Sequence, residues 1–527
     1  MERPTQRLHQ LNTTFLASLG SFSLRERWSS LSQLRRHWLI NIAIGFAIEI
    51  LVLSMHLVSV ENWATDRMMR IHALVDPAPI KGRTPPLQVF VNVDDATWRD
   101  KAWGGGEPYR APREPMLKLI ETAFNHGSTQ VVLDILVEGG NSARLQELEE
   151  DRKFADGLNK LLTNQHFGTD KRLVLVRSIR YPLPQLALDE GNIPKLLPYP
   201  ALSEIRESPL VDEVVNQSNG RIVVAAPYFA YSSDRVLRDW KLFKVVCQRK
   251  VQGGDGILRI VPSVQLLVAL KSLGMHADKV PQQADAGCTP FPPQELAALP
   301  RAAELDRLRG ATDKQEYDES VRYWKTLRFA MLRGTGKDLG EATFNGNALA
   351  NRVVFRSGAA FQADRYFNQV SARLLLQSDT DEARLNSLFA GRVTVIGQSF
   401  AEAGDQHYTP MGLLPGSVVL MNAIDAMVRY PLVQKPSGWI SWPLVFMLIV
   451  FVGYVFARWN SALGPLICTA IGVPMLAALS FYLFTYGVWL DFALPVIGIL
   501  AHREFKSFEE RRELAKLERQ VGGNHTH

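Results

Sequence analysis

Long apolar runs near both ends of the chain constrain this 527-residue sequence more than any other feature. The first run covers residues 38–60, and a second set of runs lies within residues 439–501. About 20 consecutive apolar residues form a helix long enough to cross the roughly 30 Å hydrocarbon core of a bilayer. The runs therefore predict a membrane protein with a large segment of mixed polarity between its membrane helices.

Charges beside the first run predict its orientation. Arg35, Arg36 and His37 precede the run, whereas Glu61 and Asp66 follow it. Because basic residues gather on the cytoplasmic side of membrane helices, we predict a cytoplasmic N-terminus. The basic leader is long and no small-residue cleavage site follows the run, so we interpret the run as an uncleaved anchor.

The second set divides into three predicted spans, at residues 439–456, 463–482 and 488–501. Arg458 follows the first of these, and Arg503 follows the last. Three spans place both arginines on the cytoplasmic side, whereas two spans would leave the tail outside and break the charge rule. We therefore predict four transmembrane helices, one before the central segment and three after it.

These spans predict a multi-pass protein of a bacterial-type inner membrane, with both termini in the cytoplasm. The basic residues behind the net charge of +6 cluster beside the apolar runs, so a nucleic-acid partner is not expected. The predicted parts are a cytoplasmic segment at 1–37, a first helix at 38–60, an extracytoplasmic (periplasmic) domain at 61–438, three helices at 439–501 and a cytoplasmic helical tail at 502–527.

Glu49 lies in the middle of the first predicted span. An ionisable group at the centre of a bilayer costs at least ~2.5 kcal/mol when it faces lipid, so we expect Glu49 to contact another helix. Two roles are open for this contact: a hydrogen bond that fixes helix packing, or a site of proton or signal coupling.

Two of the three cysteines, Cys247 and Cys288, lie in the central segment, and Cys468 lies in an apolar run as inert packing. In an oxidising compartment, Cys247 and Cys288 form either a disulfide or two free thiols, and the sequence leaves both alternatives open. A bridge between them would close a loop worth roughly 4 kcal/mol in the chain-entropy model.

Strand-like and helix-like segments alternate in the central segment. Residues 87–93 and 130–136 are rich in β-branched and apolar residues, and residues 112–125 have apolar side chains at helical spacing. The alternation predicts an α/β domain, layered around a largely parallel sheet, with a helical insertion at 278–340. Further strands are predicted at 173–176, 221–225, 352–356 and 393–396, and further helices at 143–162, 264–273, 381–389 and 417–429.

Four stretches of the central segment carry a family pattern. The first two are residues 91–98 (VNVDDATW) and 131–138 (VVLDILVE); the third is Asp255-Gly256 with Arg259 and Pro262; the fourth combines residues 391–397 (GRVTVIG), 404–410 (GDQHYTP), Pro415-Gly416 and 422–424 (NAI). With one predicted helix before them and three after, these stretches resemble the CHASE2 family of extracytoplasmic sensors over roughly residues 40–500.

The sequence departs from that family in two ways. The first crossover turn, residues 103–110, is WGGGEPYR, where the family usually has a Trp-Pro-Arg-like turn. The family also usually continues into a histidine kinase, a nucleotide cyclase or another output domain, whereas only about 25 residues follow the last predicted span. The resemblance therefore implies a sensor that signals through a separate partner.

Acidic side chains follow three of the predicted strands. Because ligands bind outside the carboxyl ends of the strands of a parallel α/β sheet, these acids would share one crevice if the strands are neighbours. Such a crevice would suit a cationic or hydroxyl-rich ligand or a divalent metal; alternatively, the short acids cap local turns. The candidate ligand-binding residues are Asp94, Asp95, Glu138, Asp405 and His407, with Asp134 pointing the same way as Glu138 but more buried.

Catalytic motifs are not found, and we predict no enzyme activity, no cofactor and no dedicated metal site. Residues 253–256 are glycine-rich, but the lysine and hydroxyl residue of a P-loop do not follow them. Two functions stay open: a sensor with membrane or cytoplasmic partner subunits, or a scaffold that assembles a cell-envelope complex. Either is expected to be oligomeric. The helix predicted at 505–521 either extends the last span or docks a partner.

Overall fold

The computed structural model divides the chain into two compact units. One is a helical unit that comprises Met1–Thr65, Lys435–Phe484 and Val488–His527, and the other is an α/β domain that comprises Asp66–Gln434 with Thr485–Gly487. The residues that the structure describes are 31–54, 58–75, 84–106, 111–137, 145–177, 179–180, 186–188, 194–196, 204–205, 208–232, 234–240, 243–248, 256–272, 283–288, 352–356, 367–377, 381–429, 438–459, 463–490 and single or paired positions between 497 and 515.

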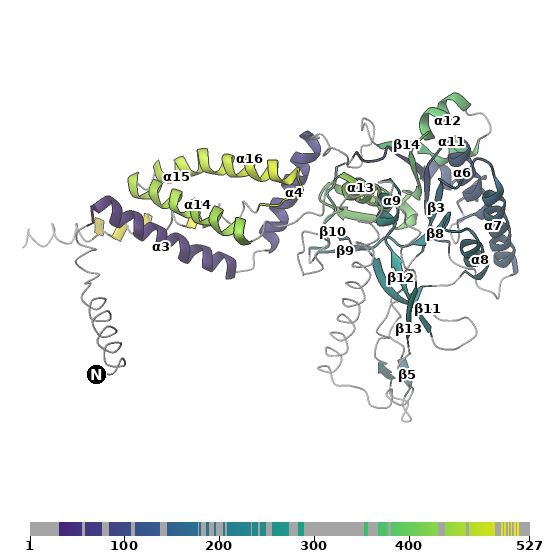
Figure 1. The fold of residues 1–527 in the computed structure, drawn as a ribbon, viewed down its shortest axis with the longest axis horizontal. Helices are drawn as coiled ribbons and strands as arrows, with labels where there is room; N and C mark the ends of the chain where they lie inside the picture. The colour runs from purple at the N-terminus through teal and green to yellow at the C-terminus, as the bar shows by residue number, and fades with distance from the viewer. Residues whose placement is uncertain are drawn as a thin grey trace, which may run out of the picture. The chain divides into compact units, whose positions relative to one another are not determined.

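A six-stranded sheet forms the centre of the α/β domain (Figure 1). Its strand order is β14-β1-β15-β2-β3-β8, and each strand runs parallel to its neighbours. The predicted layered α/β domain with a largely parallel sheet is therefore confirmed. The strands are β1 (Gln88–Val93), β2 (Gln130–Asp134), β3 (Arg172–Val176), β8 (Ile222–Ala225), β14 (Phe367–Ser371) and β15 (Val393–Gln398).

Side chains alternate between the two faces of each strand, so each face of the sheet packs against its own layer of helices. Val91, Leu133 and Ile396 lie on one face and are buried in the main hydrophobic core of the domain. The helices of this layer are α5 (Asp95–Trp98), α6 (Arg113–Asn125), α7 (Leu145–Thr163), α8 (Pro209–Gln217), α11 (Ala372–Leu376) and α12 (Glu382–Phe389).

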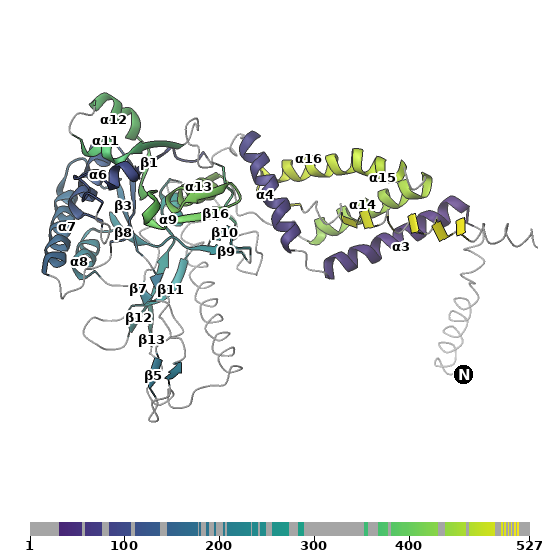
Figure 2. The same cartoon turned by 180° about the vertical axis from the view of Figure 1, so that it is seen from behind.

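Two helices, α9 (Val264–Ser272) and α13 (Gly416–Arg429), lie on the other face of the sheet (Figure 2). The amide of Gln88 on β1 donates to the Met421 carbonyl of α13, and the amide of Gln130 on β2 donates to the Val268 carbonyl of α9, each at 3.2 Å. Both glutamines are buried, so these bonds satisfy polar groups inside the helix–sheet interface. Every residue of α13 is buried, which fixes its position on the sheet.

Short strands beyond the central sheet were not predicted. A second sheet has the order β13-β12-β11-β7-β4 and is antiparallel except between β11 and β7. Three two-stranded sheets pair β5 with β6, β9 with β10 and β16 with β17. Their strands are β4 (Ile179–Arg180), β5 (Leu186–Leu188), β6 (Pro194–Leu196), β7 (Glu204–Ile205), β9 (Phe229–Tyr231), β10 (Leu237–Trp240), β11 (Phe243–Gln248), β12 (Gly256–Pro262), β13 (Gln283–Cys288), β16 (Gln406–Thr409) and β17 (Gly412–Pro415).

The strand predicted at residues 352–356 is wrong. Among the described residues, its pairing with β10 is limited to an isolated bridge between Arg352 and Asp239. The Val353 amide donates to the Arg238 carbonyl at 2.7 Å, and Arg352 forms a weak ion pair with Asp239 at 3.8 Å, without the repeated hydrogen bonds of a strand pair. Of the insertion predicted at 278–340, the structure describes only Gln283–Cys288, which forms the strand β13 rather than a helix. The remainder of that prediction lies outside the described residues.

Two antiparallel helices, α3 (Gln33–Ser54) and α14 (Gly438–Arg458), form the centre of the helical unit. The indole of Trp38 donates to the Val450 carbonyl at 3.2 Å, and further along the pair Phe46 packs against Phe446. Glycine allows the close approach, because a Cβ at Gly45 would lie 2.9 Å from Cγ2 of Ile449.

The four membrane spans predicted from the sequence have no support in the described helices. No helix in the described part of the chain combines the length and the apolar character that are needed to cross a membrane. The first predicted span covers parts of α3, which ends at Ser54, and of α4 (Val58–Val75), and residues 55–57 lie outside the described residues. The third is divided into α15 (Leu463–Ile467), the π-helical η4 (Cys468–Gly472) and α16 (Val473–Phe484). The fourth and the tail at 505–521 lie largely outside the described residues.

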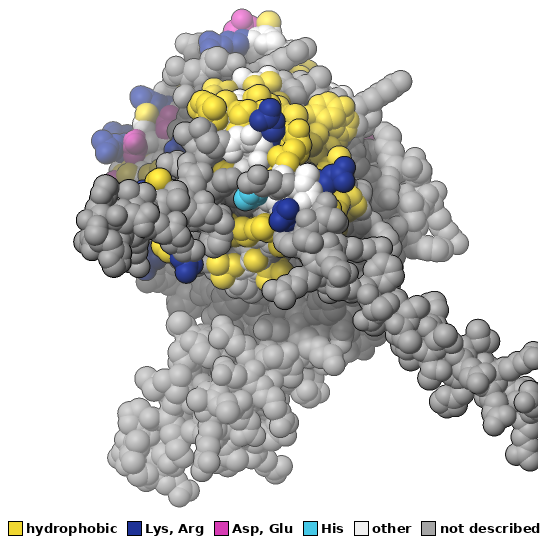
Figure 3. Space-filling model, turned by 90° about the vertical axis from the view of Figure 1, so that its left-hand side faces the viewer, with side chains coloured by type: hydrophobic (Ala, Val, Ile, Leu, Met, Phe, Trp, Pro, Cys, Tyr) yellow, Lys and Arg dark blue, Asp and Glu magenta, His cyan; other side chains and the backbone are white. Residues whose placement is uncertain are grey.

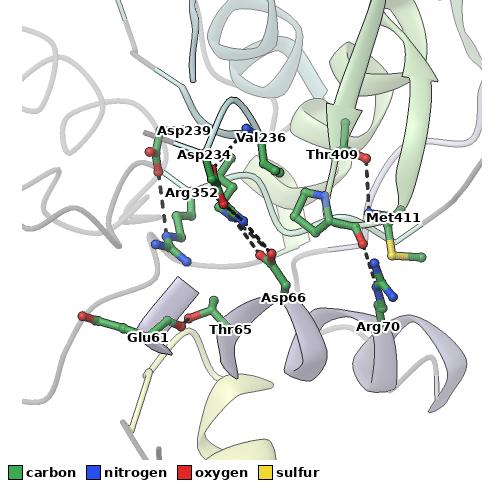
Figure 4. Close-up of polar contacts among 12 residues, drawn as sticks. Glu61, Thr65, Asp66, Arg70, Asp234, Val236, Asp239, Arg352, Thr409 and Met411 are labelled. Atoms are coloured by element: carbon green, nitrogen blue, oxygen red, sulfur yellow. Dashed lines mark hydrogen bonds and ion pairs between the residues drawn. The ribbon is translucent and has the colours of Figure 1, made fainter. Parts of the chain in front are cut away.

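Within the α/β domain, the C-terminal part of α4 is held by two polar contacts (Figure 4). The buried guanidinium of Arg238 on β10 donates to both carboxylate oxygens of Asp66 at 3.0 and 2.8 Å, and also to Asp234. One turn further along α4, Nε of Arg70 donates to the Pro410 carbonyl at 2.7 Å. Asp66, Arg238 and Asp234 form a charged clamp, so α4 is attached both to β10 and to the turn between β16 and β17.

We expect Arg238→Ala to lower the free energy of unfolding of the full chain by about 3–5 kcal/mol, because it leaves the carboxylate of Asp66 without its charged partner. Denaturant unfolding monitored by circular dichroism measures the change. Asp234→Asn is the matched control: its side chain is 47% exposed, so the loss is expected to stay below about 1 kcal/mol. Equal losses for the two variants would contradict the assignment of Asp66–Arg238 as the main attachment.

Candidate functional site

Three neighbouring parallel strands bring their carboxyl ends to one edge of the central sheet. β15 lies between β1 and β2, and Asn92, Gly397 and Asp134 are aligned in register across them. Residues aligned in this way project from the same face of a sheet, here the face that α13 covers. The neighbouring arrangement of strands on which the predicted crevice depends is therefore present.

The first turn of α13 packs directly against this row. Oγ of Ser417 donates a 2.7 Å hydrogen bond to Oδ2 of Asp134. A Cβ atom at Gly397 would overlap the Ser417 hydroxyl, so only glycine allows α13 to approach β15 this closely. The row and the helix therefore form one packed contact with Asp134 at its centre.

Asp405 reaches the same turn of α13 from the other side. The chain leaves β15 through η3 (Ala401–Ala403) and Gly404 (φ +68°) before Asp405, whose carbonyl accepts from the Gly416 amide at 3.0 Å. The Asp405 carboxylate lies so close to Gly416 that a side chain at 416 would overlap it, and its Oδ1 is 2.9 Å from Nε2 of His407. A carboxylate at the N-terminus of a 14-residue helix is stabilised by the helix dipole.

The electrostatics of this cluster favour a neutral Asp134. Burial, and to a smaller extent the neighbouring charge of Asp405, raise the pKa of the Asp134 carboxyl to about 7. The hydrogen bond from Ser417 and the charge of His407 act in the opposite direction and only partly offset the rise. The charge of Asp405 therefore disfavours the ionised form of Asp134.

The other strand-end acids make local contacts. Oδ1 of Asp94 caps α5 by accepting from the Thr97 amide at 2.8 Å and from the Thr97 hydroxyl at 2.7 Å, as the capping alternative predicts. Asp95 accepts from the Ala401 amide at 3.4 Å and so joins α5 to η3. A ligand-binding role for Asp94 and Asp95 stays a prediction, and Glu138 lies outside the described residues.

The row also contains residues that the sequence interpretation missed. Asn92 is 4% exposed, and no hydrogen-bond partner for its Oδ1 is found among the described residues. Ser417 and Gly397 complete the contact around Asp134, which had been noted only as a more buried neighbour of Glu138. The signal for Asn92 is its position on β1, where it interrupts the run of valines and phenylalanine one residue before the strand ends.

The structure describes only the backbone of the remaining sequence candidates, Glu49, Cys247 and Cys288. Glu49 lies on α3, and its side chain is outside the described residues. Cys247 and Cys288 lie on β11 and β13, on opposite sides of β12, opposite Leu258 and Gly256 respectively. Both alternatives for Cys247 and Cys288, a disulfide and two free thiols, stay open.

No group of three or more His, Cys, Asp or Glu side chains suited to a metal ion occurs in the part of the chain that the structure describes. The cluster at Asp134 offers hydrogen-bond acceptors and a titratable proton.

A parallel sheet covered by helices on both faces, with an acidic cluster at the carboxyl ends of its strands, defines a layered α/β domain whose site lies where such sheets bind ligands. The family model described as CHASE2 domain matches residues 42–457. The chain belongs to the CHASE2 domain family, and the CHASE2 domain is an extracytoplasmic sensory domain rather than a catalytic one. No curated protein and no solved structure matches the chain significantly.

We expect Asp134→Asn to stabilise the protein at high pH only. With its raised pKa, Asp134 contributes stability that is fully present below about pH 4 and is lost as the pH rises through about 7. A permanently neutral side chain that still accepts from Ser417 should raise the free energy of unfolding at pH 8 by about 1–3 kcal/mol, with little change at pH 4.5.

Denaturant unfolding of the full chain at the two pH values measures this difference. Asp381→Asn is the matched control, because Asp381 caps α12 in the same domain and asparagine caps as well as aspartate does. The same change at both pH values would contradict a titration of Asp134 in this range.

Proposed function

We propose that this CHASE2 protein is a membrane-attached sensor whose α/β domain receives an extracytoplasmic signal and passes it to a separate partner subunit. The observation that carries the proposal is a continuous connection from the acidic cluster to α4. The β16–β17 hairpin forms this connection, because the cluster lies at its base and its turn contacts α4.

The base of the hairpin is part of the cluster. Asp405 immediately precedes β16, Gly416 immediately follows β17, and the Asp405 carbonyl accepts the Gly416 amide. His407, the second residue of β16, bonds to the carboxylate of Asp405. Any change in the position of Asp405 therefore acts on both strands of the hairpin.

The turn of the hairpin is closed by its own side chain and contacts α4. The Thr409 hydroxyl donates to the Gly412 carbonyl at 2.7 Å and accepts from the Met411 amide at 3.2 Å, as Figure 4 shows in part. These bonds fix the Pro410 carbonyl, which accepts from Arg70. Helix α4 contains residues of both compact units, so it is a covalent route from the α/β domain to the helical unit.

Surface chemistry of the helical unit supports attachment to a membrane. Figure 3 shows hydrophobic side chains gathered around Lys or Arg side chains and a histidine on one face. Because α3 and α14 are antiparallel, the exposed Arg35 at the start of α3 and Arg458 at the end of α14 lie at the same end of the pair. Exposed apolar side chains of this unit include Leu39, Ile40, Ile50, Leu51, Trp442, Phe446, Met447, Phe451, Leu466, Ile471 and Met475. Such a surface is typical of contact with lipid or with another chain.

The proposed placement outside the cytoplasm predicts which positions a membrane-impermeant thiol reagent reaches. With the native cysteines replaced by serine, Tyr408→Cys on the exposed face of β16 is expected to be labelled in cells whose inner membrane is intact. The matched control Leu514→Cys, also exposed but in the predicted cytoplasmic tail, should be labelled only after that membrane is breached. Labelling of Tyr408→Cys only after breaching would contradict the proposed orientation.

If the chain signals through a separate partner, a protein with an output domain should co-purify with the full chain in mild detergent. Cross-links between the two proteins should depend on Arg70. Arg70→Ala removes the bond to Pro410 and keeps the charged clamp, so we expect the partner to remain bound while cross-links to it weaken at least about threefold. Mass spectrometry of cross-linked peptides measures this change. Arg384→Ala, an exposed arginine on α12, is the control. A partner whose cross-links are unchanged by Arg70→Ala would favour the scaffold function. Recovery of no partner would contradict both the sensor and the scaffold functions.

A further inference from the structure

The acidic cluster has more hydrogen-bond acceptors than donors. Among the described residues, Ser417 is the side chain that donates to Asp134, and His407 is the side chain that bonds to Asp405. A carboxylate can accept several hydrogen bonds, so Asp134 and Asp405 can each accept more than the one side-chain bond described here. The charged groups that act on Asp134 in the described structure are the other two titratable members, Asp405 and His407.

Asn92 adds a buried acceptor to the same row. Its side chain lies on the α13 face of the sheet, and only Gly397, which has no side chain, separates it from Asp134 along the row. The Asn92 side chain is only 4% exposed, and its Oδ1 has no hydrogen-bond partner among the described residues. A buried acceptor without a donor costs free energy, so Asn92 adds a second unsatisfied polar group to the row that contains Asp134.

Close packing limits the size of that ligand. The space above Gly397 is occupied by the Ser417 hydroxyl, and the space beside Gly416 is occupied by the Asp405 carboxylate. A ligand with heavy atoms enters between the sheet and α13 only if the helix moves away from the sheet, whereas a proton enters without any displacement. Asp405 and His407, whose side chains are 39% and 22% exposed, connect the cluster to solvent.

We propose that the Asp134–Asp405 pair is a proton-binding site, and that the signal this domain receives includes the pH outside the cytoplasm. This inference rests on the proposed sensing function and names its ligand. The protonated state has a neutral Asp134 that accepts from Ser417 beside a charged Asp405. The deprotonated state places two negative carboxylates against the same helical turn.

The pKa of Asp134, raised to about 7 by burial and by Asp405, puts the exchange between these states near neutral pH. Loss of the proton creates repulsion between Asp134, which is fixed on β2, and Asp405, which lies in a loop. The loop that contains Asp405 is therefore expected to move before β2 does, and this loop is the base of the β16–β17 hairpin. The change then reaches Arg70 on α4 through the Pro410 carbonyl.

Hydrogen–deuterium exchange of the full chain between pH 5.5 and 8.5 tests the proposal. Comparison of the wild type with Asp134→Asn at each pH cancels the intrinsic pH dependence of exchange. Peptides that cover β16, β17 and the C-terminal part of α4 are expected to exchange equally in both proteins at pH 5.5, and at least about threefold faster in the wild type at pH 8. Asp381→Asn, which caps α12, should follow the wild type.

Asp405→Asn provides a second test, which does not require Asp134→Asn to fold. Removal of the Asp405 charge removes the repulsion that acts on the loop, so the pH-dependent rise in exchange of β16 and β17 should be lost in this variant. Exchange that is identical in the wild type and Asp134→Asn at all pH values, or a pH response that Asp405→Asn leaves unchanged, would overturn the proposal. A pH response without any co-purifying partner would support the proton site and contradict the signalling function. A co-purifying partner without a pH response would support the signalling function and contradict the proton site.

Discussion

The contact between the first turn of α13 and the glycine position of β15 determines the arrangement of the whole site. Because Gly397 has no side chain, Ser417 reaches Asp134 across β15, and the same approach presses Gly416 against Asp405. A single close packing thus joins the end of β2, the loop after β15 and the start of a fully buried helix. The titration of Asp134, the position of the hairpin and the orientation of α13 all depend on this one contact.

The local sequence predicts most of the central sheet but little of what surrounds it. β1, β2 and β15 are short, buried, β-branched runs, and their crossover connections make a parallel order the expected one. β14 was missed because FNQVS has polar residues at its centre and pairs with β1 from far along the chain. The second sheet was missed for the same reason: strands such as Glu204–Ile205 are too short to carry a pattern, and their pairing is set by long-range contacts.

The site was predictable as a place and only partly as a set of residues. The rule that ligands bind at the carboxyl ends of parallel strands correctly brings together the ends of β1, β15 and β2. Asp94 could have been assigned to its cap, since Thr97 is three residues away and the contact is local. Ser417 and Asn92 could not be assigned, because their roles depend on the register that aligns Asn92, Gly397 and Asp134 and leaves room for Ser417 beside Gly397.

The two attachments of α4 differ in strength, and this difference determines how a movement of the hairpin would be transmitted. Asp66 is held by the charged fork of Arg238, whose side chain is 3% exposed, whereas Arg70 donates to a single neutral carbonyl. The two attachment points are four residues apart, about 6 Å along the helix axis. A shift of Pro410 therefore acts on α4 one turn away from a fixed point. From this geometry we infer that the response is a tilt of α4 about Asp66 rather than a sliding of the helix along its axis.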